Sequence, residues 1–133
     1  ARSASASTRL IAEEIQRIHA RCDCRIRLFD LADSTSLRHC LDEADVLINA
    51  SSVGMAPNTD ASLIPDPAFF HPGLVVGDVI YNPRETLLLR TAKEAGCHTF
   101  NGMYMLLHQG AKAFERWTGR EMPVEYIREL YFR

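Results

Sequence analysis

The segment Cys97–Trp117 constrains the fold of this chain more than any other. It starts as a short apolar stretch, is broken at Asn101-Gly102 and continues at once as a helical pattern. Apolar residues recur in that pattern at the helical spacings of three, four and seven, so they share one face of an α-helix. The residues of this face are Met103, Leu106, Leu107, Phe114 and Trp117, with Gly110 between them. We predict that the face belongs to the protein core.

Two further residues of the same helix occupy a neighbouring face. Met105 and Gln109 are four positions apart, so they stack one turn above the other beside the break at Gly102. Because a glycine lets another group approach the backbone closely, a polar amide is carried beside an open stretch of main chain. This corner is predicted to be the ligand end of the domain.

The rest of the chain alternates between helical and strand patterns. Helices are predicted over residues 7–20, 35–44, 84–95 and 123–131, with Asp33 or Ser34 as the cap of the second and a short helical turn near Pro67. Strands are predicted over 24–28, 46–48, 74–80 and 97–100. The unbroken apolar run 46–48 is typical of a strand covered on both faces. Strands separated by helices of this length indicate an α/β fold with a parallel sheet.

Three loops of small or polar residues are predicted to lie on one rim of that sheet. They span residues 49–55, 81–84 and 101–105, and each follows the carboxyl end of a strand. Ligands of open α/β sheets bind at this rim, so a nucleotide or another small polar ligand is expected there. The alternative is that these residues merely form turns, since glycine is common at strand ends.

Composition excludes several other classes of protein. The chain has 133 residues, enough for one domain, and a formal net charge of −2, which gives no electrostatic footprint for nucleic acid or for an anionic membrane. No apolar run approaches the roughly 18 to 20 residues of a membrane span, and the start ARSASAS lacks the apolar core of a signal peptide. A cytoplasmic protein is the default expectation. Neither a P-loop, a nucleophile elbow nor a zinc-protease helix motif occurs in the sequence.

Cysteine and acidic residues suggest structural roles rather than chemistry. The four cysteines are expected to be free thiols, mostly buried, because the spacing of Cys22 and Cys24 does not suit a zinc knuckle. A metal-binding domain that uses Cys22, Cys24 and His39 is a low-ranking alternative. Asp78, inside a predicted strand, is either a buried carboxylate satisfied by hydrogen bonds or a residue that lines the site, and we favour the first.

Several ordered segments resemble the C-terminal cofactor domain of shikimate dehydrogenases. They are Asp45–Met55, Val79–Pro83, Asn101-Gly102 with Met105, and Gln109–Phe114. The chain is most similar to the quinate/shikimate dehydrogenase branch, with the turn His71–Gly73 and the ending Trp117–Gly119 as further points of likeness. The resemblance covers nearly the whole chain. It implies that residues 1–133 form part of a Rossmann-like three-layer NAD(P)-binding domain with a mostly parallel sheet, lacking its first strand and glycine-rich turn.

The resemblance also implies residue roles. The parent protein would transfer a hydride between a nicotinamide and shikimate or quinate and its 3-dehydro acid. Positions matching the cofactor contacts of the family are Arg2, Ser3, Asn49, Ala50, Ser51, Ser52, Val79, Ile80, Tyr81, Asn82, Gly102 and Met105. Gln109 matches the glutamine that binds the hydroxyl groups of the substrate, and Tyr81 is expected close to the substrate as well.

Departures from the family pattern limit what this chain is expected to do alone. The catalytic lysine and aspartate of the family belong to an N-terminal domain, and neither matches a position in this chain, so isolated residues 1–133 are predicted to be inactive. Arg2 favours a 2′-phosphate and hence NADP, with NAD as the alternative. Ser52 replaces a frequent lysine and Tyr104 a usual glycine. A homodimer is one expected assembly, and a non-catalytic nucleotide-binding or interaction module is the alternative function.

Overall fold

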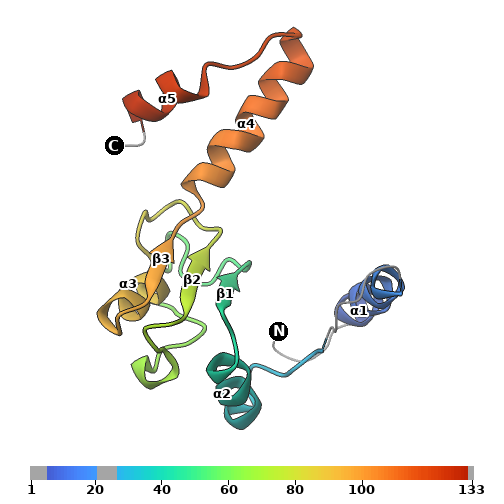
Figure 1. Ribbon diagram of the computed structural model, residues 1–133, viewed down its shortest axis with the longest axis vertical. Helices are drawn as coiled ribbons and strands as arrows, with labels where there is room; N and C mark the ends of the chain where they lie inside the picture. Colours follow the sequence, from blue (N-terminus) through green and yellow to red (C-terminus); the bar gives the residue numbers. More distant parts are fainter. Residues whose placement is uncertain (1–5, 21–26, 132–133) are drawn as a thin grey trace. The chain divides into compact units, whose positions relative to one another are not determined.

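The computed structural model describes residues 6–20 and 27–131 of the chain. By its internal contacts the chain divides after Glu43 into two compact units, which are described separately here. Figure 1 shows the elements of each unit along the colour ramp from blue to red.

In the described part of the first unit lie the helices α1 (Ala6–His19) and α2 (Ser34–Asp42), which confirms both predicted helices. The Asp33 side chain accepts hydrogen bonds from the amides of Thr35 and Ser36, so it is the N-cap of α2. The predicted strand 24–28 lies partly outside the described residues, at 24–26. Arg27 and Leu28 belong to no strand, so the prediction is wrong there. An alternating pattern of polar and apolar residues forms a strand only where a neighbouring strand supplies hydrogen-bond partners.

The second unit is built on a parallel sheet in the order β1-β2-β3. Its strands are β1 (Val46–Asn49), β2 (Val75–Asp78) and β3 (His98–Phe100). Both pairings are parallel, as predicted, and the register places Asn49 opposite Asp78 at the carboxyl ends of β1 and β2. This register brings the loops that follow the two strands to the same rim.

Helix α3 (Leu87–Glu94) packs against β2 and β3 and encloses the core of this unit. The core consists mainly of Leu74 and Val76 from the strand side and of Leu88, Leu89 and Ala92 from the helix. The helix begins three residues later than predicted because the Thr86 side chain caps it. It ends at Glu94 with Ala95 as its C-cap, and the expected stop residue, Gly96, follows with a φ of 87°, in the left-handed region. The predicted turn at Pro67 is the short 3₁₀ helix η1 (Pro67–Phe69).

Helices α4 (Met103–Thr118) and α5 (Val124–Tyr131) follow the sheet and pack against each other. On the predicted core face of α4, Leu107 is buried, but Phe114 is 36% and Trp117 84% exposed. The prediction that this whole face is core is therefore wrong, because the far half of α4 packs on no sheet in this unit. In the described part of the chain, no helix is long and apolar enough to cross a membrane.

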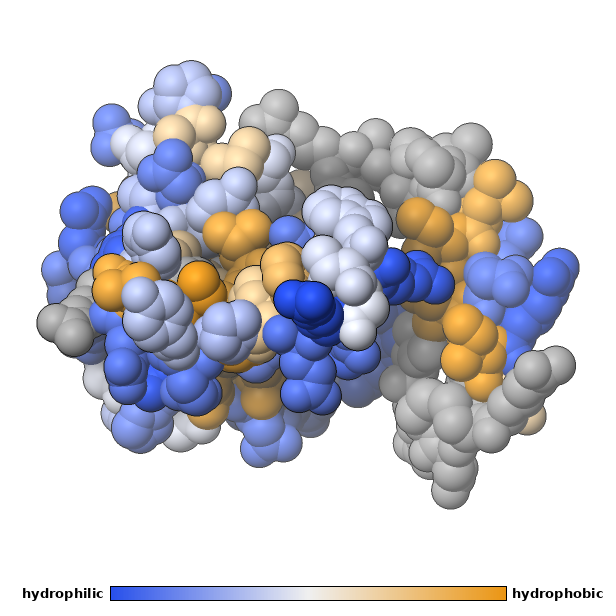
Figure 2. Space-filling view, turned by 90° about the horizontal axis from the view of Figure 1, so that it is seen from above, coloured by the Kyte–Doolittle hydropathy of each residue, from blue (hydrophilic) through white to orange (hydrophobic). Residues whose placement is uncertain are grey.

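Strand β1 also departs from expectation. Val46 and Ile48 are 51% and 56% exposed. The prediction that this strand is covered on both faces is therefore wrong. The two residues alternate with Leu47, so they lie on the same face of the sheet, and the described helix α3 packs on β2 and β3 instead. Figure 2 shows apolar residues, in orange, standing between hydrophilic ones at the surface.

Candidate functional site

A cavity of about 380 Å³ lies where the loop after β1 meets the segment after β2. Its lining residues are Ser51, Ser52, Met55, Ala56, Val79, Ile80, Tyr81 and Asn82. Two of the three predicted loops therefore form one surface, because neighbouring parallel strands end at the same rim. The main-chain amide of Ala56 donates to the carbonyl of Asn82 at 3.3 Å and closes the junction between the two walls.

The first wall is shaped by Asn49, the last residue of β1. Its side-chain oxygen accepts hydrogen bonds from the amide of Ser51 at 3.0 Å and from the hydroxyl of Ser51 at 2.7 Å. The Ser51 hydroxyl in turn accepts from the amide of Val53 at 3.2 Å. An asparagine and a serine in these positions fold the loop back on its own strand. Consequently Ser51 and Ser52 face the cavity while Asn49 is only 2% exposed.

The second wall is held by Asp78, the last residue of β2. The carboxylate is 1% exposed and accepts hydrogen bonds from the amide of Ile80 at 2.9 Å, from the Asn49 amide nitrogen at 3.2 Å and from the Thr86 hydroxyl at 2.8 Å. This confirms the prediction of a buried carboxylate satisfied by hydrogen bonds. The carboxylate does not line the cavity.

The third predicted loop joins the second wall from the side of α4. The amide of Gly102 donates to the carbonyl of Ile80 at 3.0 Å, and a side chain added at Gly102 would overlap the main chain of Val79. The neighbouring Asn101 ties the same loop to the carbonyl of Arg84 at 2.8 Å and to the first amide of α4, that of Met103, at 3.1 Å. The glycine thus allows the close approach of the protein's own backbone.

The structure places the sequence-predicted site residues in three ways. Six of them line the cavity: Ser51, Ser52, Val79, Ile80, Tyr81 and Asn82. Asn49 and Gly102 are buried directly behind the lining, while Ala50, Met105 and Gln109 are exposed and outside it. Arg2 and Ser3 lie outside the described residues. The ligand contacts of all these residues stay predictions.

Sequence reasoning did not assign Met55 and Ala56 to the site, although both line the cavity. The available signal was their position, since Met55 ends the predicted loop 49–55, which already contained four predicted contacts, and Ala56 directly follows it. For Asp78 the sequence favoured a buried carboxylate over a residue lining the site, and it did not predict the partners, Asn49 at 29 positions and Thr86 at eight positions along the chain.

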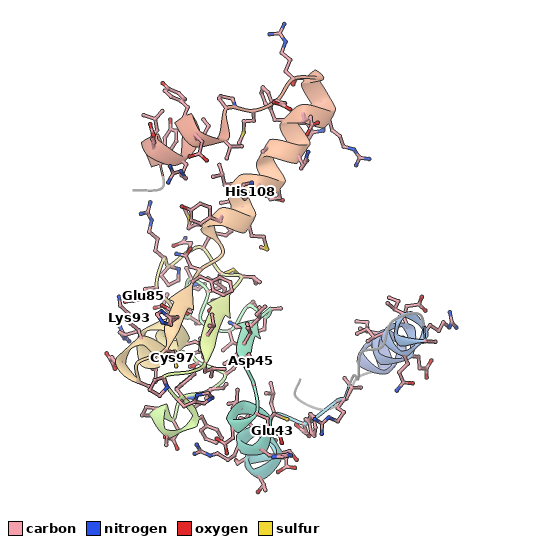
Figure 3. The ribbon with its side chains drawn as sticks, viewed as in Figure 1. Glu43, Asp45, Glu85, Lys93, Cys97 and His108 are labelled. Atoms are coloured by element: carbon pink, nitrogen blue, oxygen red, sulfur yellow. The ribbon has the colours of Figure 1, made fainter. Side chains whose placement is uncertain are left out.

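The cavity carries little ionisable chemistry. Tyr81 is the only ionisable side chain among its eight lining residues, and it is 46% exposed. His39, His71, His98 and His108 do not line it; His108, labelled in Figure 3, stacks on Tyr104 with ring centroids 6.4 Å apart. The described residues contain no group of three or more His, Cys, Asp or Glu side chains suited to a metal ion. Cys22 and Cys24, which the metal alternative requires, lie outside those residues. The cavity is thus equipped to bind a ligand, and its lining holds no acid/base pair.

A second cavity of about 400 Å³ lies beside β3, next to Arg84, Phe100 and Tyr104. It shares no lining residue with the first cavity, although Arg84, Asn101 and Tyr104 belong to the predicted rim loops 81–84 and 101–105. Its main cationic group is already engaged, because the Arg84 guanidinium donates to the carbonyl of Tyr131 at 2.9 Å. The cavity between the loops after β1 and β2 is therefore the candidate site.

A parallel sheet, a packed crossover helix and a cavity at the carboxyl ends of adjacent strands together define a Rossmann-like α/β domain. Comparison with known proteins agrees with this class. Residues 102–130 match the family model described as the shikimate 5′-dehydrogenase C-terminal domain. The chain superimposes with a TM-score of 0.81 and 44% sequence identity on a crystal structure of shikimate 5-dehydrogenase from Listeria monocytogenes, solved in complex with shikimate and NAD. The match covers 90% of this chain and 42% of that protein.

Curated relatives point to the same family. The chain is 46% identical over 118 residues to shikimate dehydrogenase (NADP(+)) of Listeria monocytogenes serotype 4b, a match that covers 89% of this chain. It is 44% identical over 115 residues to quinate/shikimate dehydrogenase of Escherichia coli O139:H28, which covers 86% of this chain. The chain spans 40% of the length of each of these relatives. Over most of its length, the chain is therefore similar to the C-terminal part of shikimate and quinate/shikimate dehydrogenases.

Proposed function

We propose that the protein carrying this chain is an NAD(P)-dependent shikimate or quinate dehydrogenase and that the chain supplies its cofactor site. The observation that carries the proposal is the cavity between the Ser51-Ser52 loop and the Val79–Asn82 segment, at the rim where such sheets bind nucleotides. The named activities of the relatives support the substrate class.

The residues present fit a nicotinamide dinucleotide. One wall offers the hydroxyl group of Ser52, which suits a ribose or phosphate oxygen, and the other offers the apolar surface of Val79 and Ile80, which suits a flat ring. When bound, the cofactor supplies or accepts the hydride. The chain's own residues bind it, orient its ring and limit the access of water.

Two side chains are proposed to orient the cyclic substrate. Tyr81 lines the cavity and is half exposed. Gln109, an exposed residue of α4, offers a side-chain amide that can pair with the hydroxyl groups of the substrate. The cavity lining holds no pair of ionisable groups to deliver a proton to the carbonyl, because Tyr81 is its only ionisable residue. The proton is therefore proposed to come from residues outside this segment, and residues 1–133 alone are expected to give no turnover.

NADP is proposed as the preferred cofactor and NAD as the alternative. The name of the Listeria relative specifies NADP(+), while a solved Listeria structure holds NAD. The sequence also favours NADP, because an arginine such as Arg2 suits the 2′-phosphate of that cofactor. A cytoplasmic location and a homodimer stay predictions.

Equilibrium binding and turnover test the proposal together. The purified protein that carries this chain is titrated with NADP⁺ and with NAD⁺ by calorimetry, and shikimate and quinate oxidation are followed through the absorbance of the reduced cofactor. Tighter binding of NADP⁺ than of NAD⁺, with oxidation of one of the two acids, is expected. If neither dinucleotide binds, the proposal is wrong.

A matched pair of variants locates the binding. Ser52→Trp places a bulky ring in the cavity and is expected to abolish cofactor binding. Ser34→Trp puts the same ring on an exposed serine of α2, outside the lining, and is expected to bind cofactor as the wild type does. Equal binding by both variants would contradict the assignment of the cavity.

The second candidate function, a nucleotide-binding or interaction module without catalysis, rests on the cavity's lack of an acid/base pair. The same experiment separates the two functions. Cofactor binding without oxidation of either acid by the complete protein would favour the module.

A further inference from the structure

Three buried polar side chains form one hydrogen-bonded network behind the candidate cofactor cavity. Asn49, Asp78 and Thr86 are 2%, 1% and 1% exposed, and they come from the end of β1, the end of β2 and the N-cap of α3. The Asn49 amide nitrogen lies 3.2 Å from one carboxylate oxygen of Asp78, and the Thr86 hydroxyl lies 2.8 Å from the other. Buried polar groups of this kind are costly unless all are paired, and here each finds partners.

Each of the two central side chains also holds one wall of the cavity. The Asn49 amide nitrogen donates to the carbonyl of Val53 at 3.2 Å, and its oxygen accepts from the amide and hydroxyl of Ser51. The carboxylate oxygen of Asp78 that faces Asn49 also accepts from the amide of Ile80 at 2.9 Å. Ser51 and Ile80 line opposite walls of the cavity.

The contact between Asn49 and Asp78 therefore joins the two walls through a short chain of bonds. One end of the chain is the Ser51 amide, and the other is the Ile80 amide. Neither Asn49 nor Asp78 lines the cavity itself. Both side chains use their polar atoms on protein groups, so their effect on a ligand passes through the loops that they hold.

We propose that Asn49 and Asp78 are a positioning pair, which sets the separation of the Ser51-Ser52 loop from the Val79–Asn82 segment and so determines cofactor affinity. The inference rests on the proposed function, because it concerns the same cavity. Loops that are held in the bound geometry before binding lose less conformational freedom on binding, and a missing tie between the walls lowers affinity for that reason. The role belongs to the hydrogen-bonding shape of Asp78 and not to its charge.

The conservative variant Asp78→Asn separates these two properties. The asparagine oxygen keeps the acceptor for the Asn49 side chain and the Ile80 amide, and its NH₂ group takes the place of the oxygen that faces the Thr86 hydroxyl. Asp78→Asn is therefore expected to bind NADP⁺ within about twofold of the wild type, whereas Asp78→Ala and Asn49→Ala, which cut the tie, weaken binding at least about tenfold.

The control for general destabilisation is Leu88→Ala. Leu88 is 2% exposed in α3 and lines neither wall, so its truncation leaves a hole in the core and lowers the melting temperature without touching the tie. This variant is expected to keep the wild-type dissociation constant at a temperature where it remains folded. Asn49→Ser serves as the milder substitution if either alanine variant does not fold, and it is expected to weaken binding because the shorter side chain cannot reach both Ser51 and Asp78.

The experiment measures the NADP⁺ dissociation constant by calorimetry, together with the melting temperature, for the complete protein and these variants. Weaker binding by the Asn49 and Asp78→Ala variants, retained binding by Asp78→Asn and unchanged binding by Leu88→Ala support the positioning pair. Wild-type binding by Asn49→Ala or Asn49→Ser overturns it, as does a loss in Asp78→Asn equal to that in Asp78→Ala. If the wild-type protein itself binds no dinucleotide, the proposed function fails instead.

Discussion

Gly102 packs directly against the main chain of Val79, and its amide donates a hydrogen bond to the carbonyl of Ile80 at 3.0 Å. The first residue of α4 comes immediately after this contact. The start of α4 is therefore fixed to the wall of the candidate cavity by a contact that only a residue without a side chain permits.

Substitution of Gly102 by alanine is expected to lower stability by about 3 kcal/mol, because the methyl group meets backbone atoms, which cannot turn away as a side chain would. The φ of Gly102 is −75°, so conformational strain is not the cause. Urea denaturation of the wild type and the variant measures the difference in the free energy of unfolding.

Gly110 provides the matched control in the same helix. Nothing lies within 4 Å of a side chain added there, so Gly110→Ala should raise the free energy of unfolding by about 0.5–1 kcal/mol through helix propensity. A loss of stability at Gly110 as large as that at Gly102 would show that the packing against Val79 is not the reason.

The sequence could predict most elements of the fold because their signals are local. The Asp33 cap, the left-handed stop at Gly96 and the break at Gly102 are each recognisable within a few residues, and the structure has a helix or strand boundary at each. The parallel order followed from the alternation of strands and helices.

Which element packs against each apolar face could not be predicted from the sequence in the same way. An apolar stripe shows that a face is suited to burial, but not which element lies against it. Phe114 and Trp117 on α4 and Ile48 on β1 belong to such stripes and are exposed in the structure. Similarly, the loops of the candidate site were predictable from strand ends, whereas the bond between Asn49 and Asp78 joins residues 29 positions apart and has no local signal.

Thr86 is predicted to stabilise the second unit through its hydroxyl group more than through its shape. The hydroxyl donates to Asp78 at 2.8 Å and accepts from the amide of Leu89 at 3.4 Å. Thr86→Val keeps the volume but leaves a buried carboxylate oxygen and a helix amide without a partner, which should cost about 2 kcal/mol or more. Thr86→Ser keeps both bonds and should cost less. Thermal denaturation compares the two, and a serine variant less stable than the valine variant would contradict this prediction.

Asp33 is predicted to make the stability of α2 depend on pH. The hydroxyl of Ser36, at 2.6 Å from the carboxylate, and then the amides of Ser36 and Thr35 hold the pKa of Asp33 below its usual range. The charged form is favoured in the folded state, so the stabilisation is complete above the ordinary aspartate pKa of about 4 and is lost as the pH falls through the lower folded value.

The comparison variant for this titration is Asp33→Asn, which keeps an effective N-cap but cannot titrate. Amide NMR spectra recorded from pH 7 to about pH 2.5 should show the Ser36 resonance of the wild type moving with an inflection below the ordinary aspartate value, and that of the variant remaining flat. An inflection at or above pH 4 in the wild type would show that the cap does not favour the charged carboxylate.

Cys97 is predicted to resist alkylation in the folded protein. It is 7% exposed, and burial raises the pKa of its thiol, so little thiolate forms near neutral pH. The Sγ atom also lies 3.2 Å from the carbonyl of His71, and Cys97, labelled in Figure 3, directly precedes β3. Cys40, which is only half-buried in α2, is the internal reference.

Iodoacetamide labelling followed by peptide mass mapping should therefore modify Cys97 about an order of magnitude more slowly than the half-buried Cys40 at pH 7.5, because burial of Cys97 limits both the access of the reagent and the formation of its thiolate. Raising the pH should speed the reaction at Cys97, because the raised pKa places its titration above neutrality. Denaturant should bring the two rates together, which separates the effect of burial from that of local sequence. Equal rates in the folded protein would mean that the contact between α3 and the strand that follows it opens readily, and that Cys97 is not a stable part of the core.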